Sequence, residues 1–76
     1  MGLAMTKTAA ERRQDLLNAK EGTSCKSVEH AQRLLRSAGF VKDQNPRRWA
    51  WKVDGVHLLA EIVGVKKDTK ILVTEV

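Results

Sequence analysis

An Asp-Gly pair between two apolar, alternating segments is the feature that most limits how this chain can fold. Asp54-Gly55 lies between the segments Arg47–Val53 and Val56–Val63. Asp-Gly favours a two-residue type I′ turn, in which both turn residues have positive φ, and such turns join neighbouring antiparallel strands. The sequence therefore predicts a β-hairpin with Val53 opposite Val56.

The turn also fixes which side chains share a face of the sheet, because side chains alternate between faces along a strand. One face is expected to be apolar and to receive a helix; it holds Trp49, Trp51, Val53, Val56, Leu58, Ala60 and Ile62. The other face is expected to meet solvent; it holds Arg48, Ala50, Lys52, His57, Leu59 and Glu61. Both tryptophans are thus predicted to be core residues rather than rings for base stacking. Trp49 is nearer the open end of its strand, so we expect it to be the more exposed.

Two helices are predicted before the hairpin. Thr8 and Glu11 have the spacing of a capping box, which starts the first helix, and Gly22 is its expected end. Ser27 is the expected N-cap of the second helix, with Ser24 as the other candidate. Apolar residues at helical spacing form one stripe on this helix: Val28, Ala31, Leu34, Leu35 and Ala38.

The remaining segments complete an α+β fold. Residues 23–26 are interpreted as a polar link, and Asp43–Pro46 as a loop. A tight turn at Lys66–Thr69 leads to a last strand over Lys70–Val76. We expect two N-terminal helices packed on a three-stranded antiparallel meander, or a four-stranded one if a short strand starts at Phe40-Val41.

Composition is typical of one small folded domain over residues 1–76, of which residues 1–7 are expected to be disordered. Hydrophobic residues make up 42% and charged residues 30% of the chain, which favours a globular, soluble domain. Cys25 is the single cysteine, so no internal disulfide can form and a reducing, cytoplasmic location is expected. We expect no metal, no cofactor and no membrane partner, because ligand clusters and long apolar runs are missing.

The positive charge of the chain is concentrated in residues 33–52. The formal net charge is +5, and the rest of the chain holds eight basic and eight acidic residues. Against one acid, Asp43, the segment carries Arg33, Arg36, Lys42, Arg47, Arg48 and Lys52. A local positive excess attracts polyanions, because neutralised phosphates release their counterions. We therefore favour DNA or RNA as the partner; the alternative is a solvated sheet face with Arg48 paired to Glu61.

A second hypothesis makes the chain a protein-interaction module, a homodimer or a small inhibitor of a larger protein. The last strand carries Glu75 as its one charge over residues 71–76 and is expected at a sheet edge, where it would pair with a copy or another sheet. The expected interface residues are Leu59, Ile71, Val73 and Val76.

We expect no enzymatic activity, since no glycine-rich phosphate loop, paired catalytic carboxylates or cysteine–histidine pair is present in the sequence. The remaining catalytic hypothesis is an RNase-like reaction through His57, which the register places beside Lys52.

Two family resemblances rest on one segment of the chain. The run Leu34–Lys42, followed by a basic loop and Arg48-Trp49-Ala50-Trp51, resembles the recognition-helix-to-wing segment of winged-helix DNA binders. The same segment is similar to small toxins of the HicA type, which resemble double-stranded-RNA-binding domains. The chain lacks an evident third helix for the first family and the final helix of the second. Its His57 follows Asp54-Gly55-Val56 rather than the Gly-Ser of the toxins, and we assign the chain to neither family.

Overall fold

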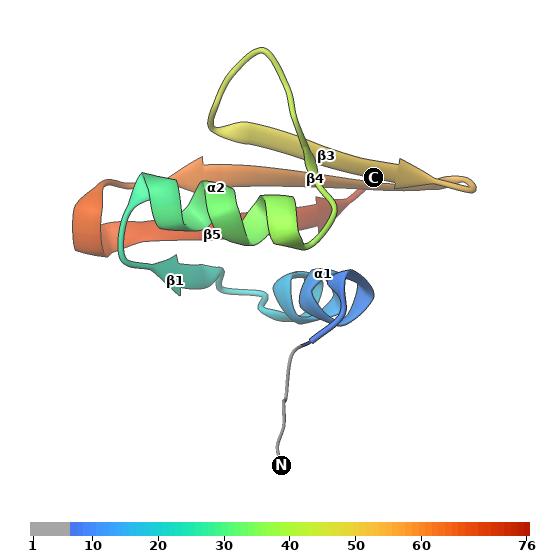
Figure 1. Ribbon diagram of the computed structural model, residues 1–76, viewed down its shortest axis with the longest axis horizontal. Helices are drawn as coiled ribbons and strands as arrows, with labels where there is room; N and C mark the ends of the chain where they lie inside the picture. Colours follow the sequence, from blue (N-terminus) through green and yellow to red (C-terminus); the bar gives the residue numbers. More distant parts are fainter. Residues whose placement is uncertain (1–6) are drawn as a thin grey trace.

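The computed structural model describes residues 7–76 as two helices on one five-stranded antiparallel sheet (Figure 1). In chain order the elements are α1 Ala9–Asn18, β1 Thr23–Cys25, α2 Val28–Ser37, β2 Val41–Lys42, β3 Arg48–Val53, β4 Val56–Val63, the 3-10 turn η1 Lys66–Asp68 and β5 Thr69–Glu75. The predicted α+β class is confirmed. The disorder expected over residues 1–7 falls, apart from Lys7, outside the described residues. Over this described part of the chain, no helix has the length and apolar character needed to cross a membrane.

The strands are ordered β1-β5-β4-β3-β2 across the sheet. Strands β2 to β5 form the predicted meander, and the short strand β2 makes it four-stranded. β1 then adds a fifth strand on the outer side of β5, where Thr23 pairs with Ile71 and Cys25 with Thr69. The prediction that the last strand is an edge strand is therefore wrong for Thr69–Ile71, which β1 covers, whereas β1 does not pair with the part of β5 beyond Ile71.

β1 occupies the segment that the sequence suggested was a polar link. Thr23 and Cys25 turn toward the helices and Ser24 turns away, and Cys25 is buried in the core. A three-residue segment with two hydroxyl side chains has no clear apolar pattern of its own. It is a strand here because the backbone groups of β5 need partners on that side.

The predicted hairpin register is confirmed for all six residue pairs between β3 and β4. Asp54 and Gly55 have φ values of 50° and 82°, as a type I′ turn requires. The division of faces follows from this register. Under the helices lie the buried side chains of Trp49, Leu58, Ala60 and Ile62.

The two tryptophans are buried in the opposite order from the one expected. Trp49 is 2% exposed, because the loop before β3 closes over it and its indole N–H donates to the Pro46 carbonyl at 2.9 Å. Trp51 lies nearer the hairpin tip and is half-buried. Arg13 of α1 covers its ring, with the guanidinium carbon 3.9 Å from the ring centroid. The same guanidinium donates to the Ala38 carbonyl at 2.8 Å, so Arg13 fastens α1 to both α2 and the sheet.

Both helices begin where the sequence predicted. Thr8 and Glu11 form the capping box of α1, and Ser27 caps α2. α1 ends at Asn18, earlier than the Gly22 that was expected to end it. The apolar stripe of α2 then lies against the sheet, as its spacing indicated.

The two helices pack on the same face of the sheet, so the core is a single layer between helices and strands (Figure 1). The buried apolar residues are Leu16, Cys25, Ala31, Leu35, Ala38, Phe40, Trp49, Leu58, Ala60, Ile62 and Ile71. The other side of the sheet, here called the open face, is covered by no element within residues 7–76. Its side chains are Ser24, Val41, Arg48, Ala50, Lys52, His57, Leu59, Glu61, Val63, Lys70, Leu72 and Thr74.

Candidate nucleic-acid interface

The six basic residues predicted to contact nucleic acid lie on two sides of the sheet. Arg48 and Lys52 project from β3 on the open face. Lys42 of β2 is on the helix side, and Arg33 and Arg36 lie on the exposed side of α2. Alternation along β2 and β3 therefore separates residues that are close in sequence, and one flat ligand surface meets only one of the two groups.

Arg47 is bound to the fold itself. Its side chain is half-buried, and its Nη1 donates to the Ile62 carbonyl at 3.2 Å and to the Gly64 carbonyl at 2.9 Å. These carbonyls lie at the end of β4, so the guanidinium ties the loop before β3 to the neighbouring strand. The two hydrogen bonds hold Nη1 of Arg47 against its own fold.

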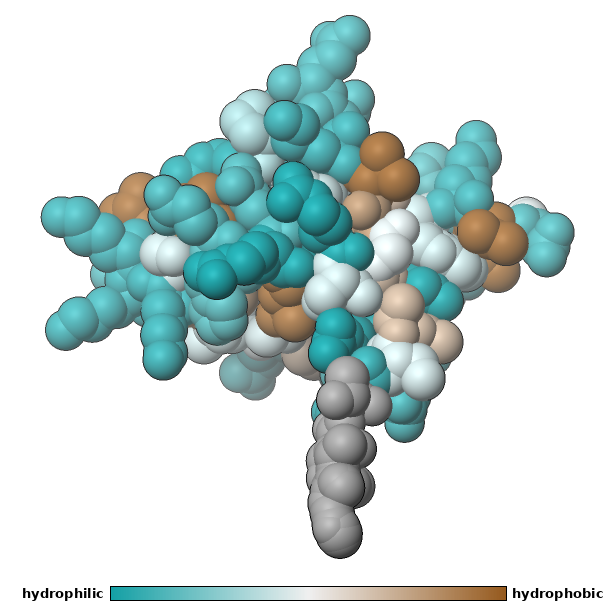
Figure 2. Space-filling view, viewed as in Figure 1, coloured by the Kyte–Doolittle hydropathy of each residue, from teal (hydrophilic) through white to brown (hydrophobic). Residues whose placement is uncertain are grey.

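A basic hollow of about 770 Å³ lies between α1 and α2. Three cationic side chains and one imidazole come together there from two helices and the link between β1 and α2. The lining residues are Arg12, Lys26, Ser27, His30, Arg33, Leu34 and Ser37. None of these lining residues is acidic. Hydrophilic side chains also cover most of the molecule on the side shown in Figure 2. A surface lined by positive groups alone attracts anions more strongly than a solvated surface on which positive and negative groups are mixed.

Sequence reasoning missed Arg12 and Lys26 as members of this surface. Lys26 lies outside the 33–52 segment, and Arg12 belongs to a charge-rich, weakly amphipathic helix. Which side of such a helix meets a neighbour is decided by tertiary contacts rather than by its own pattern. The charge-rich composition of α1 was the available signal, but composition alone does not say which side of the helix faces the hollow.

His30 adds a hydrogen-bond donor with a fixed tautomer. The Lys26 backbone N–H donates to His30 Nδ1 at 3.2 Å, and the His30 backbone N–H donates to Ser27 Oγ at 3.1 Å. Because Nδ1 is the acceptor, the neutral imidazole carries its proton on Nε2. Because His30 lines the hollow, an anion there would meet its imidazole together with the cationic groups.

Within residues 7–76, no ion pair joins a cation of the hollow to a carboxylate. The ion pair found in this range joins Lys7 and Asp15, and the hydrogen bond between them raises the pKa of Lys7. Glu29 lies one turn before Arg33 on α2 without forming an ion pair with it. The charges near α2 are therefore available to an external anion.

The cationic surface continues past the end of α2. The Arg36 guanidinium carbon is 5.6 Å from the Trp49 ring centroid, and Lys42 follows on the same side of the sheet. We use the name α2-side cluster for five residues: Arg12, Lys26, Arg33, Arg36 and Lys42.

The residues predicted for a protein interface are not equally accessible. Ile71 is fully buried, and Val73 is half-buried against the core. Leu59 is 44% exposed on the open face, and Val76 is 72% exposed. A partner can therefore contact Leu59 and Val76 directly, whereas the side chains of Ile71 and Val73 are taken up by the domain's own core.

The remaining reactive side chains are isolated. His57 is half-buried on the open face opposite Lys52, and no hydrogen bond to its imidazole is found within residues 7–76. An RNase-like role for His57 stays a hypothesis. Burial raises the pKa of the Cys25 thiol, which disfavours the reactive thiolate. The described residues contain no group of three or more potential metal ligands.

Comparison with known proteins gives no relative for this chain. No protein-family model matches it, and neither the curated proteins nor the solved structures contain a significant match.

Proposed function

We propose that this domain binds nucleic acid through the α2-side cluster and contacts mainly the phosphate backbone. The observation that carries the proposal is the hollow between α1 and α2, where Arg12, Lys26 and Arg33 converge without an acidic neighbour in the lining. Arg36 and Lys42 extend this surface beyond the hollow, along a path that a phosphate backbone could follow.

The aromatic residues favour backbone contact over base recognition. Trp49 is buried, and Trp51 is half-buried beneath Arg13, so neither ring offers an open stacking platform. Binding through the α2-side cluster is then mostly electrostatic, with little sequence preference. Arg48 and Lys52 lie on the open face and take no part in the same contact.

Fluorescence anisotropy with labelled duplex DNA, duplex RNA and single strands over a range of salt concentrations tests the proposal. Neutralising about five phosphates predicts a log–log salt slope of about −4 to −5. The double variant Arg33→Glu/Arg36→Glu should weaken binding at least about tenfold and reduce the slope by about 2. A slope near zero for the unmodified protein would rule out the proposal.

The matched control reverses two charges on the open face, in the variant Lys52→Glu/Lys70→Glu. Both double variants change the net charge equally, so they separate a local contact from general attraction. The control should bind nearly as well as the unmodified protein. Equal losses in the two variants would mean that net charge, rather than the α2-side cluster, attracts the nucleic acid.

A further inference from the structure

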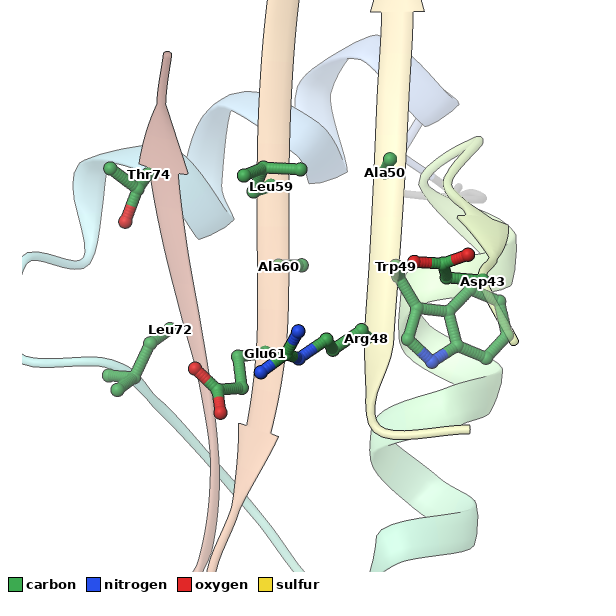
Figure 3. A pocket seen from close by; sticks show the side chains of 9 residues that line it. All are labelled: Asp43, Arg48, Trp49, Ala50, Leu59, Ala60, Glu61, Leu72 and Thr74. Carbon is green, nitrogen blue, oxygen red and sulfur yellow. The ribbon is translucent and has the colours of Figure 1, made fainter. Parts of the chain in front are cut away.

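The open face carries an apolar hollow of about 500 Å³ between rows of side chains (Figure 3). Neighbouring strands place these side chains in register across the face. One row is Val41, Ala50, Leu59 and Thr74, and the next is Arg48, Glu61 and Leu72. The small side chain of Ala50 leaves space beside Leu59, which deepens the surface at that point.

Large apolar side chains on this face remain in contact with solvent. Val41 is 70%, Leu59 44% and Leu72 38% exposed. Apolar side chains grouped on one uncovered sheet face mark an interaction surface more often than scattered ones do. The nature of the partner follows from the charges in the neighbouring row.

We propose that a second copy of this chain covers the open face in a symmetric dimer. The twofold axis would run parallel to the strands, midway between β3 and β4, with the two sheets packed face to face about 10 Å apart. This axis exchanges β3 and β4 between the copies. It therefore places Leu59 of each copy over Ala50 of the other, a large side chain against a small one.

The same axis makes the charged row complementary to itself. Arg48 and Glu61 are direct cross-strand neighbours; the Arg48 side chain extends toward Glu61, and the Glu61 carboxylate lies on the side of Leu72 (Figure 3). The twofold operation places Arg48 of each copy over Glu61 of the other. The four groups then form a square in which every charge has opposite charges as its nearest neighbours. A patch with this property is self-complementary, which is the requirement for a twofold interface.

Sedimentation velocity over a wide range of protein concentrations tests the proposal. The unmodified chain should reach twice the monomer mass. Arg48→Glu places four negative charges in the square and Glu61→Arg places four positive ones, so each variant should raise the dimer dissociation constant at least about tenfold. The combined variant Arg48→Glu/Glu61→Arg should recover the dimer.

Mixing the two single variants gives the most specific result. A chain with Arg48→Glu should pair with a chain with Glu61→Arg, because each opposing pair of charges is then attractive. Formation of this mixed dimer also proves that both variants are folded. A monomer mass at every concentration for the unmodified chain overturns the proposal and leaves the open face to a different protein. A dimer unaffected by both single variants also overturns it, because the contact must then lie on another surface.

Discussion

Two glycines with nearly the same φ angle have very different surroundings. Gly55 and Gly64 have φ values of 82° and 84°. A Cβ at Gly55 would meet nothing within 4 Å, whereas at Gly64 it would lie 2.2 Å from the Asp68 carbonyl oxygen. We expect Gly55→Ala to reduce the free energy of unfolding by about 1 kcal/mol, because of its positive φ. Gly64→Ala should cost about 1–3 kcal/mol more, since the turn through η1 must shift. Urea unfolding checks the difference, and equal losses would contradict the close approach at Gly64.

Single residues also show where sequence reasoning about the site succeeded. Arg33 and Arg36 lie off the predicted apolar stripe of α2, which sets the buried side of this helix, and both are exposed. The same reasoning gave no sign that Arg47 would turn back onto two carbonyls of its own fold. The predicted order of tryptophan burial was wrong, because the Pro46 carbonyl that accepts from Trp49 is positioned by a loop rather than by strand alternation.

At the scale of elements, adjacent arginines of α1 have different roles. Arg13 holds α1 on Trp51 and Ala38, whereas Arg12 lines the basic hollow. Arg13→Ala should therefore reduce the free energy of unfolding by about 1–3 kcal/mol and speed hydrogen exchange over residues 9–18. Arg12→Ala should leave stability within about 0.5 kcal/mol and weaken polyanion binding instead. Chemical unfolding of both variants measures the stability loss expected for Arg13→Ala, and fluorescence anisotropy measures the binding loss expected for Arg12→Ala. Similar stability losses in the two variants would show that Arg13 does not anchor the helix.

The elements that sequence predicted well are those specified by neighbouring residues. The hairpin register followed from Asp54-Gly55 and alternation, and both helix starts followed from their capping residues. β1 and the hollow between the helices were missed because each depends on contacts between distant segments. β1 is held by β5, and the hollow exists because Arg12 and Arg33 come together from two helices. No local pattern encodes either juxtaposition.

For the whole molecule, the two proposed surfaces lie on opposite sides of the sheet and should act independently. The variant Arg33→Glu/Arg36→Glu should lose nucleic-acid affinity and keep the dimer mass. Leu59→Lys should give monomers, because it places a charge over Ala50 of the second copy, yet keep the same salt slope per chain on a short duplex. Sedimentation velocity and anisotropy on the same samples check both statements. Loss of the dimer in the α2-side variant would show that the surfaces are coupled.

The pairing of β1 with β5 has a consequence for the order in which the molecule forms. Helix turns and the β3–β4 hairpin close short loops, whereas β1 can pair only after β5 has joined the sheet. We therefore expect β1, the first strand along the chain, to be the last strand to join the sheet during folding. Until then Ile71 has a strand partner on one side only, Ile62 of β4, and the growing domain keeps a temporary edge on the side that β1 later closes.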